Sequence, residues 1–223
     1  MGLTNNNTRC VLVLGGSFDP IHLGHVALAS CLTRRLQPDE LRLIPAGQPW
    51  QKSALTATSE QRVSMLKLAF EDWKDCPITI DEQEIQRAEQ QQSSYTIDTL
   101  KQLRAECGAD TSIIFAMGAD QLQNLHTWHQ WRDLFELANL CVAARPGYSL
   151  KIVSQEVAKE WHDRLTSAED MRHQPNGTTM IEPALAVDVS ATQLRTELKQ
   201  HNPTMRLLVP HKVLDYIQQH SIY

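Results

Sequence analysis

The residues best suited to chemistry lie between Gly15 and His25, in the stretch Gly-Gly-Ser-Phe-Asp-Pro-Ile-His-Leu-Gly-His. They follow the apolar run Cys10–Leu14, which is typical of a strand buried on both faces of a parallel sheet. Gly15 and Gly16 allow a sharp turn, and backbone N–H groups at such a turn or at a helix start bind phosphate. His22 and His25 are three residues apart, so they share a face if both lie in a first helical turn. Two imidazoles beside a phosphate-binding turn predict phosphoryl chemistry.

Each histidine has a simpler explanation when it is considered alone. Either His22 or His25 could be a partly buried residue or a helix cap, but the pair after Gly-Gly at a strand end favours a functional role. Two familiar phosphate motifs are absent from the sequence. Without G-x-G-x-x-G there is no dinucleotide fingerprint, and without G-x-x-x-x-G-K-[ST] there is no P-loop.

A second candidate segment is Val189–Arg195, at a predicted helix start. Ser190 is a good N-cap residue, and Thr192 lies in the first turn. Free N–H groups there would hold an anion, and Arg195 could fork onto phosphate oxygens. Considered alone, the segment is better explained as a capped surface helix with a solvated arginine.

Together the two segments resemble the nucleotidyltransferase superfamily with an H-x-G-H motif, whose second motif has the form I-S-[ST/A]-T-x-x-R. Here Val189 replaces Ile, and Ala191 occupies the variable position. The resemblance implies that both histidines contact the triphosphate of ATP and that the arginine stabilises the pentavalent centre and the leaving pyrophosphate. The candidate catalytic residues are therefore His22, His25 and Arg195. The candidate ATP-binding residues are Gly15, Gly16, Ser17, Phe18, His22, His25, Asp120, Ser190, Thr192 and Arg195.

Segments in the middle of the chain indicate which molecule accepts the transferred group. They resemble the S-Y-T-x-x-T-L, G-x-D-x-L and L-x-x-W-x-x-W segments of bacterial nicotinate-nucleotide adenylyltransferases. The matching residues are Ser94–Leu100, Gly118–Leu122 and Leu125–Trp131, and Arg145-Pro146-Gly147 also fits. The resemblance runs from about Val11 to Ile217 and is weak over residues 150–178.

The resemblance implies an acceptor site for a pyridine ring with a carboxylate. Trp128 is the expected platform, because an indole stacks on an electron-poor pyridinium; ordinary core packing is the alternative. Trp131 is expected in the core. Backbone N–H groups near Thr96 and His129 could accept the carboxylate, and such donors would disfavour the amide form.

Two further positions belong to this resemblance. Asp120 is expected to touch the ribose or to shape the nucleotide loop, with a helix cap as the alternative. Lys52 could reach phosphates from the loop Gln48–Lys52. The family often has P-P-H-[KR] there, whereas this chain has Gln-Pro-Trp-Gln-Lys, so the role of the loop histidine is unfilled.

The alternation of apolar runs with helical patterns predicts an α/β fold. We expect a Rossmann-like open parallel sheet, built from right-handed βαβ units with helices on both faces. The expected strands are Cys10–Leu14, Leu41–Ile44, Ile78–Ile80, Ile113–Met117, Leu140–Ala144 and Thr179–Ile181. The expected helices are Gly24–Leu36, one after a capping box of Thr58 and Gln61, one opened by Ser93–Thr96, one near Trp131–Asn139, and Ser190–Gln200 and Pro210–His220 near the end.

We interpret residues 8–223 as a single nucleotidyltransferase domain with C-terminal helices. Residues 150–178 are polar, contain the turn Pro175-Asn176-Gly177, and are interpreted as a surface insertion with some helix. Residues 185–223 are interpreted as a C-terminal helical part that carries the second phosphate motif.

Composition narrows the class of protein. The 223 residues include 21 basic and 26 acidic side chains, a net charge of −5, which argues against general nucleic-acid binding. The apolar runs are too short to span a membrane, and the polar N-terminus lacks a signal region, so we expect a cytoplasmic protein without a membrane partner. The five cysteines are odd in number and lack C-x-x-C spacing, so we expect reduced thiols, mostly in the core. We expect a monomer or a small homo-oligomer.

The expected reaction is in-line attack of the 5′-phosphate of nicotinate mononucleotide on the α-phosphorus of ATP. The second pKa of the attacking phosphate is about 6, so no protein general base is required. Mg²⁺ would be carried by the ATP phosphates without a dedicated protein site. The alternatives are the same reaction on the amide nucleotide or on another phosphate acceptor, and a nucleotide-binding sensor or scaffold without catalysis.

Overall fold

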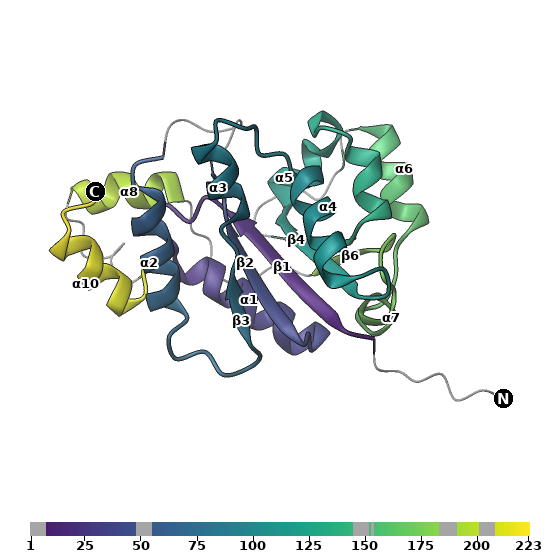
Figure 1. Cartoon of the computed structure of the whole chain (residues 1–223), viewed down its shortest axis with the longest axis horizontal. Helices are drawn as coiled ribbons and strands as arrows, with labels where there is room; N and C mark the ends of the chain where they lie inside the picture. Colours follow the sequence, from purple (N-terminus) through teal and green to yellow (C-terminus); the bar gives the residue numbers. More distant parts are fainter. Residues whose placement is uncertain (1–7, 48–54, 145–151, 153, 183–190, 201–207) are drawn as a thin grey trace.

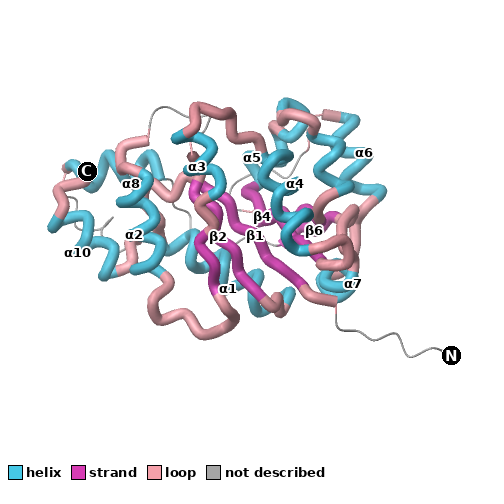
Figure 2. The backbone as a smooth tube through the Cα atoms, viewed as in Figure 1, coloured by secondary structure: helices cyan, strands magenta, loops and turns pink. Residues whose placement is uncertain are grey.

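The computed structural model describes residues 8–47, 55–144, 152, 154–182, 191–200 and 208–223. In this part of the chain, six strands form one parallel sheet in the order β3-β2-β1-β4-β5-β6 (Figure 2). The strands are β1 (Cys10–Gly16), β2 (Glu40–Pro45), β3 (Ile78–Ile80), β4 (Ser112–Gly118), β5 (Asn139–Ala143) and β6 (Thr179–Glu182). The predicted parallel sheet is confirmed, and each predicted strand is present with bounds shifted by one residue at most, except that β1 extends two residues further, to Gly16.

The strand order predicts where on the sheet a ligand binds. Strand order reverses between β1 and β4, which pair in register with Leu14 opposite Ala116. In open α/β sheets, ligands bind outside the carboxyl ends of the strands at such a switch point. The turn that begins at Gly15 and Gly16 leaves the sheet there, and so does the end of β4 at Gly118.

Side chains of β1 alternate between two cores, one on each face of the sheet. Cys10, Leu12 and Leu14 belong to one core, whereas Val11 and Val13 belong to the other. The first core is covered by α1 (Leu23–Leu36), α2 (Ser59–Ala69), α7 (Ala168–His173), α8 (Ala191–Lys199) and α10 (His211–Gln219). The second is covered by α4 (Thr96–Cys107), α5 (Ala119–Gln123), α6 (Gln155–Asp163) and the 3₁₀ helices η1 (Leu125–Thr127) and η2 (Trp131–Glu136). Helices therefore lie on both faces, as predicted, and α2 contacts α10 at one end of the molecule (Figure 1).

One helical prediction requires correction, and some short helices were not predicted. The helix expected near Trp131–Asn139 is the 3₁₀ helix η2, which ends at Glu136, and Asn139 already belongs to β5. The sequence analysis missed α3 (Gln83–Glu89) between β3 and α4. Its only buried apolar residue is Ile85, too little for a recognisable helical stripe.

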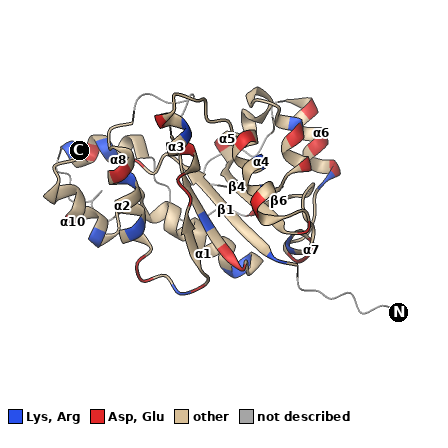
Figure 3. Ribbon diagram, in the orientation of Figure 1, with Lys and Arg blue, Asp and Glu red and all other residues tan. Residues whose placement is uncertain are grey.

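Residues 150–178 are not a mere surface insertion. Their described part contains α6 and α7, which carry the chain from β5 to β6. Val157, Trp161 and Met171 on these helices are fully buried, the first two in one core and Met171 in the other. The polar composition that suggested an insertion includes the acidic and basic residues interspersed along α6 (Figure 3).

The cysteines are reduced and lie in or near the core. All five cysteines are free thiols, of which Cys10 and Cys141 are buried and the other three are half-buried. Burial raises the pKa of Cys10 to about 11, so this thiol is a core residue rather than a nucleophile.

Among the described residues, no helix combines the length and the apolar character that a bilayer crossing requires.

Candidate active site at the carboxyl ends of β1 and β4

The turn after β1 is tightly built around Phe18. Phe18 is fully buried and adopts a left-handed backbone conformation with φ of 46°. Its ring lies so close to Gly16 that a Cβ atom there would be 3.1 Å from the ring. The Gly16 carbonyl accepts a hydrogen bond from Ala46 N–H at 2.8 Å. A side chain at position 16 would therefore be crowded against the Phe18 ring, which packs against this turn.

His22 and His25 stack at the start of α1. His22 is the N-cap residue and His25 is the third helical residue. Their ring centroids are 3.7 Å apart with an interplanar angle of 21°, and His25 Nδ1 accepts a hydrogen bond from His22 N–H at 3.3 Å. The ring of Phe18 meets His25 edge-on, with centroids 5.0 Å apart. The two imidazoles thus share one face, as their spacing predicted, whereas their contact with phosphate stays a prediction.

The second motif comes back to the first through Arg195. Its Nη1 donates to the carbonyl oxygen of Asp19 at 2.8 Å and lies 3.9 Å from Asp19 Oδ2. Its Nη2 lies 3.4 Å from Thr192 Oγ1, a residue in the first turn of α8. Ser190, predicted as the cap of this helix, lies outside the described residues. The fold therefore brings the guanidinium to the loop that precedes His22.

Asp19 is a site residue that the sequence analysis did not single out. Its side chain is buried, and its carboxylate accepts hydrogen bonds from Thr56 N–H at 2.8 Å, Ala57 N–H at 3.0 Å and Tyr223 O–H at 2.6 Å. An aspartate inside an otherwise apolar Phe-Asp-Pro-Ile segment was the available signal, because a buried carboxylate needs several donors.

Arg62 is a second residue that was missed. This α2 side chain is fully buried, and its Nη1 donates to the carbonyl oxygen of Ser17 at 2.9 Å. Burial lowers its pKa, and the charge of Asp19 opposes that effect. Arg62 thus supports the phosphate-binding turn from α2 and adds a positive charge beneath it.

The end of β4 lies beside this turn. A Cβ atom at Gly118 would be 2.5 Å from Asp120 Oδ1, so glycine is required for the carboxylate to fold back over the strand end. Asp120 lies in the first turn of α5, where the helix dipole favours a negative charge, and its Oδ2 accepts a hydrogen bond from Gln121 Nε2 at 2.7 Å. The N-cap residue of α5 is Gly118, and Asp120 is the second helical residue, so the capping alternative is not supported for Asp120. Its ribose contact stays a prediction.

Phe115 connects the phosphate-binding turn to the predicted acceptor residues. Its ring would be 3.5 Å from a Cβ atom at Gly15 and meets Trp128 edge-on, with centroids 6.3 Å apart. Trp128 is half-buried, and its buried Nε1 has no hydrogen-bond partner among the described residues. Trp131 is buried in the second core, as predicted. The ring of Phe115 therefore lies between Trp128 and the turn, and the stacking role of Trp128 stays a prediction.

The start of α4 approaches Trp128 through an aromatic contact. Tyr95, the N-cap residue of α4, packs on the exposed His129 with ring centroids 4.7 Å apart. Thr96 is the first residue of α4, so its N–H is among the free donors of the helix start. The start of α4 and His129 are thus in contact through Tyr95, whereas a shared ligand at Thr96 and His129 stays a prediction. Lys52 lies outside the described residues.

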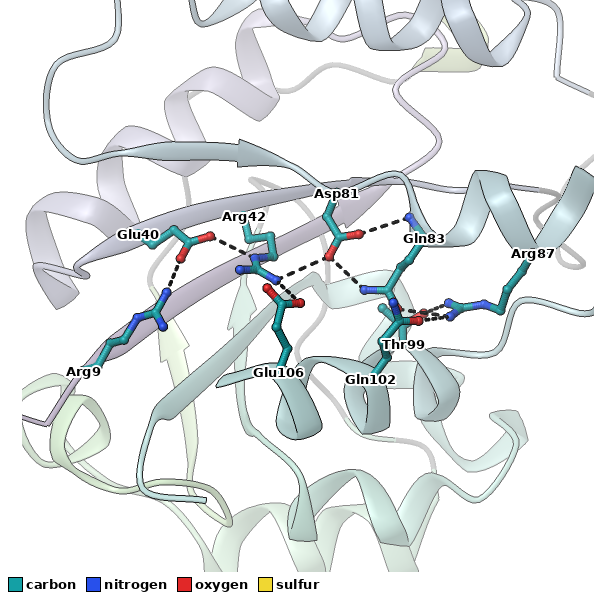
Figure 4. A network of polar contacts seen from close by, with 9 residues as sticks. All are labelled: Arg9, Glu40, Arg42, Asp81, Gln83, Arg87, Thr99, Gln102 and Glu106. Atoms are coloured by element: carbon teal, nitrogen blue, oxygen red, sulfur yellow. Dashed lines mark hydrogen bonds and ion pairs between the residues drawn. The ribbon is translucent and has the colours of Figure 1, made fainter. Parts of the chain in front are cut away.

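A polar network holds α3 and α4 against the sheet (Figure 4). Thr99 on α4 accepts a hydrogen bond from Arg87 on α3. Thr99 also donates to Glu84, on the same helix α3, at 2.8 Å. Burial raises the pKa of Glu84, and hydrogen bonds from Thr99 and from the N–H of Gly47 counteract it. The unexpected helix α3 therefore fixes the first turns of α4.

Buried charge continues the network along β2 (Figure 4). Arg42 donates to Glu40 and to Glu106, each at 2.9 Å, and lies 3.6 Å from Asp81. The hydrogen bonds from Arg42 and Arg9 outweigh burial and lower the pKa of Glu40. This cluster joins β2, β3 and α4 and is structural.

Comparison with known proteins identifies the family. Residues 13–197 match the model of cytidylyltransferase-like domains. A protein of Herminiimonas arsenicoxydans named probable nicotinate-nucleotide adenylyltransferase is 48% identical over 219 residues, which cover 97% of each chain. A protein of the same name from Laribacter hongkongensis is 40% identical, over 95% of this chain and 93% of the relative. The chain belongs to the nicotinate-nucleotide adenylyltransferase family.

Solved structures agree on the fold. The nicotinic acid mononucleotide adenylyltransferase of Plasmodium falciparum, solved in complex with NaAD, superposes with a TM-score of 0.73, covering 96% of this chain and 97% of its own. A putative nicotinate-nucleotide adenylyltransferase from Vibrio parahaemolyticus superposes with a TM-score of 0.62 over 95% of this chain and 99% of its own. Their sequence identities are 15% and 13%, so they support the Rossmann-like architecture alone.

Within this adenylyltransferase family, the predicted site residues form two adjacent groups. One lies around the turn after β1 and comprises Gly15, Gly16, Ser17, Phe18, His22, His25, Thr192 and Arg195, with Asp120 at the neighbouring strand end. The other comprises Thr96, Trp128 and His129. Phe115 touches both groups, which suits a reaction between two bound nucleotides.

Proposed function

We propose that this chain transfers the adenylyl group of ATP to nicotinate mononucleotide, giving nicotinate adenine dinucleotide and pyrophosphate in NAD biosynthesis. The observation that carries the proposal is the hydrogen bond from Arg195 to Asp19, which assembles both nucleotidyltransferase motifs around one turn. The names of the relatives support the same acceptor, and the Plasmodium falciparum enzyme was solved with NaAD and with APC.

Catalysis in this site relies on alignment and on charge stabilisation. The attacking phosphate has a second pKa of about 6, so at neutral pH it is mostly ionised and needs no general base. The stacked His22 and His25 and the guanidinium of Arg195 would face the triphosphate, where charge spreads over oxygens in the transition state. Arg62 beneath Ser17 adds positive potential without contacting the substrate.

The acceptor would bind between Trp128 and the start of α4. The half-buried indole of Trp128, which forms a T-shaped pair with Phe115, would offer a flat surface for the pyridinium ring. Free N–H groups at Thr96, and the backbone near His129, would receive the carboxylate. An amide in that position would place its NH₂ against donors, so the acid form is favoured.

Mg²⁺ would accompany the ATP phosphates and neutralise part of their charge. No group of three metal-ligating side chains occurs among the residues that the structure describes. Asp19, three positions before His22 in the sequence, already has both carboxylate oxygens occupied by hydrogen-bond donors. The protein would act in the cytoplasm as a monomer or small homo-oligomer, with neither nucleic acid nor membrane as a partner.

The decisive experiment is a measurement of pyrophosphate release from Mg²⁺-ATP with nicotinate mononucleotide or nicotinamide mononucleotide. A strong preference for the acid supports both the reaction and the acceptor site. A preference for the amide keeps the reaction and discards the roles of Thr96 and His129. Release with neither nucleotide, despite intact His22 and Arg195, would favour another acceptor or a nucleotide-binding sensor without catalysis.

A further inference from the structure

Tyr223 reaches the phosphate-binding turn from the far end of the sequence. It is 204 positions away from Asp19, yet its hydroxyl donates to Asp19 Oδ1 at 2.6 Å. Its ring packs against the first core, beside α10. Burial, together with the hydrogen bond to Asp19, raises the pKa of Tyr223 far above its usual value, so the phenol remains a neutral donor.

The carboxylate that receives this hydroxyl is fully enclosed. Asp19 is 1% exposed. Besides Tyr223, it accepts the backbone N–H groups of Thr56 and Ala57, one on each oxygen. Three donors from two distant segments leave the carboxylate a single orientation, because a buried charge is stable only when its oxygens are satisfied.

Asp19 in turn positions Arg195. The guanidinium donates to the main-chain carbonyl oxygen of Asp19 and lies 3.9 Å from its Oδ2. If the carboxylate lost one donor, its charge would attract the guanidinium more strongly and draw it off the carbonyl oxygen. The side chain that is proposed to face the phosphates would then be displaced toward Asp19.

We propose that Tyr223 is a positioning residue for adenylyl transfer, whose hydroxyl orients Asp19 so that Arg195 points at the triphosphate. The inference rests on the proposed function, because the benefit is realised on bound ATP. It adds a requirement that neither motif contains: a tyrosine about 30 residues beyond the second motif completes the site built by the first.

Tyr223→Phe tests the hydroxyl while keeping the ring in the core. Loss of a hydrogen bond to a charged group corresponds to a change of roughly tenfold in an equilibrium or rate constant. We therefore expect kcat to fall about tenfold. Binding of a non-reacting ATP analogue, α,β-methylene-ATP, should weaken about fivefold in titration calorimetry, whereas the KM for nicotinate mononucleotide should stay within about twofold. The matched control is Tyr216→Phe, on α10, whose ring contacts His220 outside the site. It should change none of these quantities.

A double-mutant cycle with Arg195→Lys separates positioning from general stabilisation. If Tyr223 acts through Arg195, then Tyr223→Phe should lower kcat by less than about twofold when Arg195 is already lysine. Independent, multiplicative losses would overturn the inference, and so would a Tyr223→Phe variant that loses thermal stability but keeps wild-type kcat and analogue affinity.

The two proposals fail in different ways. If the wild-type chain releases no pyrophosphate with either mononucleotide, the proposed function fails, while analogue binding still tests Tyr223 in the same samples. If the wild type is active and Tyr223→Phe matches it in kcat and in analogue affinity, only the role of Tyr223 is wrong.

Discussion

Arg195 and Asp19 are 176 positions apart, and the Nη1 of Arg195 donates to the main-chain carbonyl oxygen of Asp19 at 2.8 Å. Because the acceptor is a main-chain oxygen, the guanidinium of Arg195 is bound to the backbone of the loop. Its position is therefore fixed relative to the turn that carries the predicted phosphate-binding N–H groups. The remaining donors of the fork stay available for a second acceptor. A triphosphate bound at the turn would be that acceptor.

Arg195→Lys should therefore damage turnover more than stability. Lysine keeps the charge but lacks the fork that can hold a loop carbonyl and a phosphate at once. We expect turnover to fall by about 100-fold, as for the loss of one transition-state donor. Pyrophosphate release and thermal denaturation would be measured in parallel. Arg132→Lys, an exposed residue paired with Glu156, is the control. Unaltered turnover of Arg195→Lys would contradict the assignment.

His22→Asn separates the two roles of the first histidine. His22 caps α1, and asparagine is an equally good cap residue, so the helix start should survive the exchange. The stack on His25 and the imidazole donor are lost. We expect turnover to drop by about 100- to 1,000-fold with an unchanged circular dichroism spectrum. If His22→Asn turned over ATP as fast as the wild type, the histidine would be only a helix cap.

Trp128→Ala should weaken the acceptor more than ATP. The indole face is the predicted platform, and loss of a stacking contact of this kind corresponds to about tenfold in affinity. Titrations with nicotinate mononucleotide and with α,β-methylene-ATP would give the two affinities. Trp128→Phe retains a flat ring and should recover part of the loss. A larger effect on the ATP analogue than on the mononucleotide would refute the stacking role.

The parts of this fold that local pattern determines were predictable. The run before Gly15 satisfies both faces of a central strand, so its strand and turn followed from residue types alone. The capping box is equally local. Gln61 N–H donates to Thr58 Oγ1 at 3.2 Å and the Thr58 N–H donates to Gln61 Oε1 at 2.9 Å, as the spacing predicted.

The parts that depend on distant partners were not predictable. The role of Asp19 was not predicted, because its donors at Thr56, Ala57 and Tyr223 are brought together only by tertiary folding. Similarly, Trp161 lies in a polar segment, and its complete burial depends on where α6 packs on the second core. The composition of such a segment is dominated by its exposed residues, so it does not show which few side chains pack in the core.

Arg42→Met should destabilise the protein without affecting the site. Removing the buried guanidinium leaves Glu40, Asp81 and Glu106 facing one another without their shared cation (Figure 4). We expect the free energy of unfolding to fall by about 3 kcal/mol, as for one partner of a buried ion pair. Urea denaturation measures this loss. At urea concentrations well below the unfolding midpoint, the variant should retain its activity.

The control for Arg42 is Arg132→Met. Arg132 and Glu156 form a pair in which both side chains are more than half exposed. Breaking such a pair changes stability by less than about 1 kcal/mol. Equal losses for the two variants would show that Arg42 behaves as an ordinary surface charge.

Glu84→Gln should change how stability depends on pH. Burial raises the pKa of Glu84 in the folded state above the ordinary value of 4.5, despite the hydrogen bonds from Thr99 and Gly47 and the charge of Arg87, and Asp81 adds to the rise. The folded state therefore binds the proton more tightly than the unfolded state does. The contribution of this group to stability is greatest below the unfolded pKa and is lost as pH rises through the folded pKa. Glutamine cannot ionise, so relative to the wild type the variant should gain stability as pH increases from about 4.5 toward neutrality. Urea midpoints at several pH values in that window would show it, with the exposed Glu82→Gln as the control for removing one carboxylate. A constant difference between Glu84→Gln and the wild type across the window would mean that folding leaves the pKa of Glu84 unchanged. A loss of stability in the variant relative to the wild type as pH rises would mean that Arg87 and the Gly47 N–H lower this pKa and keep the carboxylate ionised.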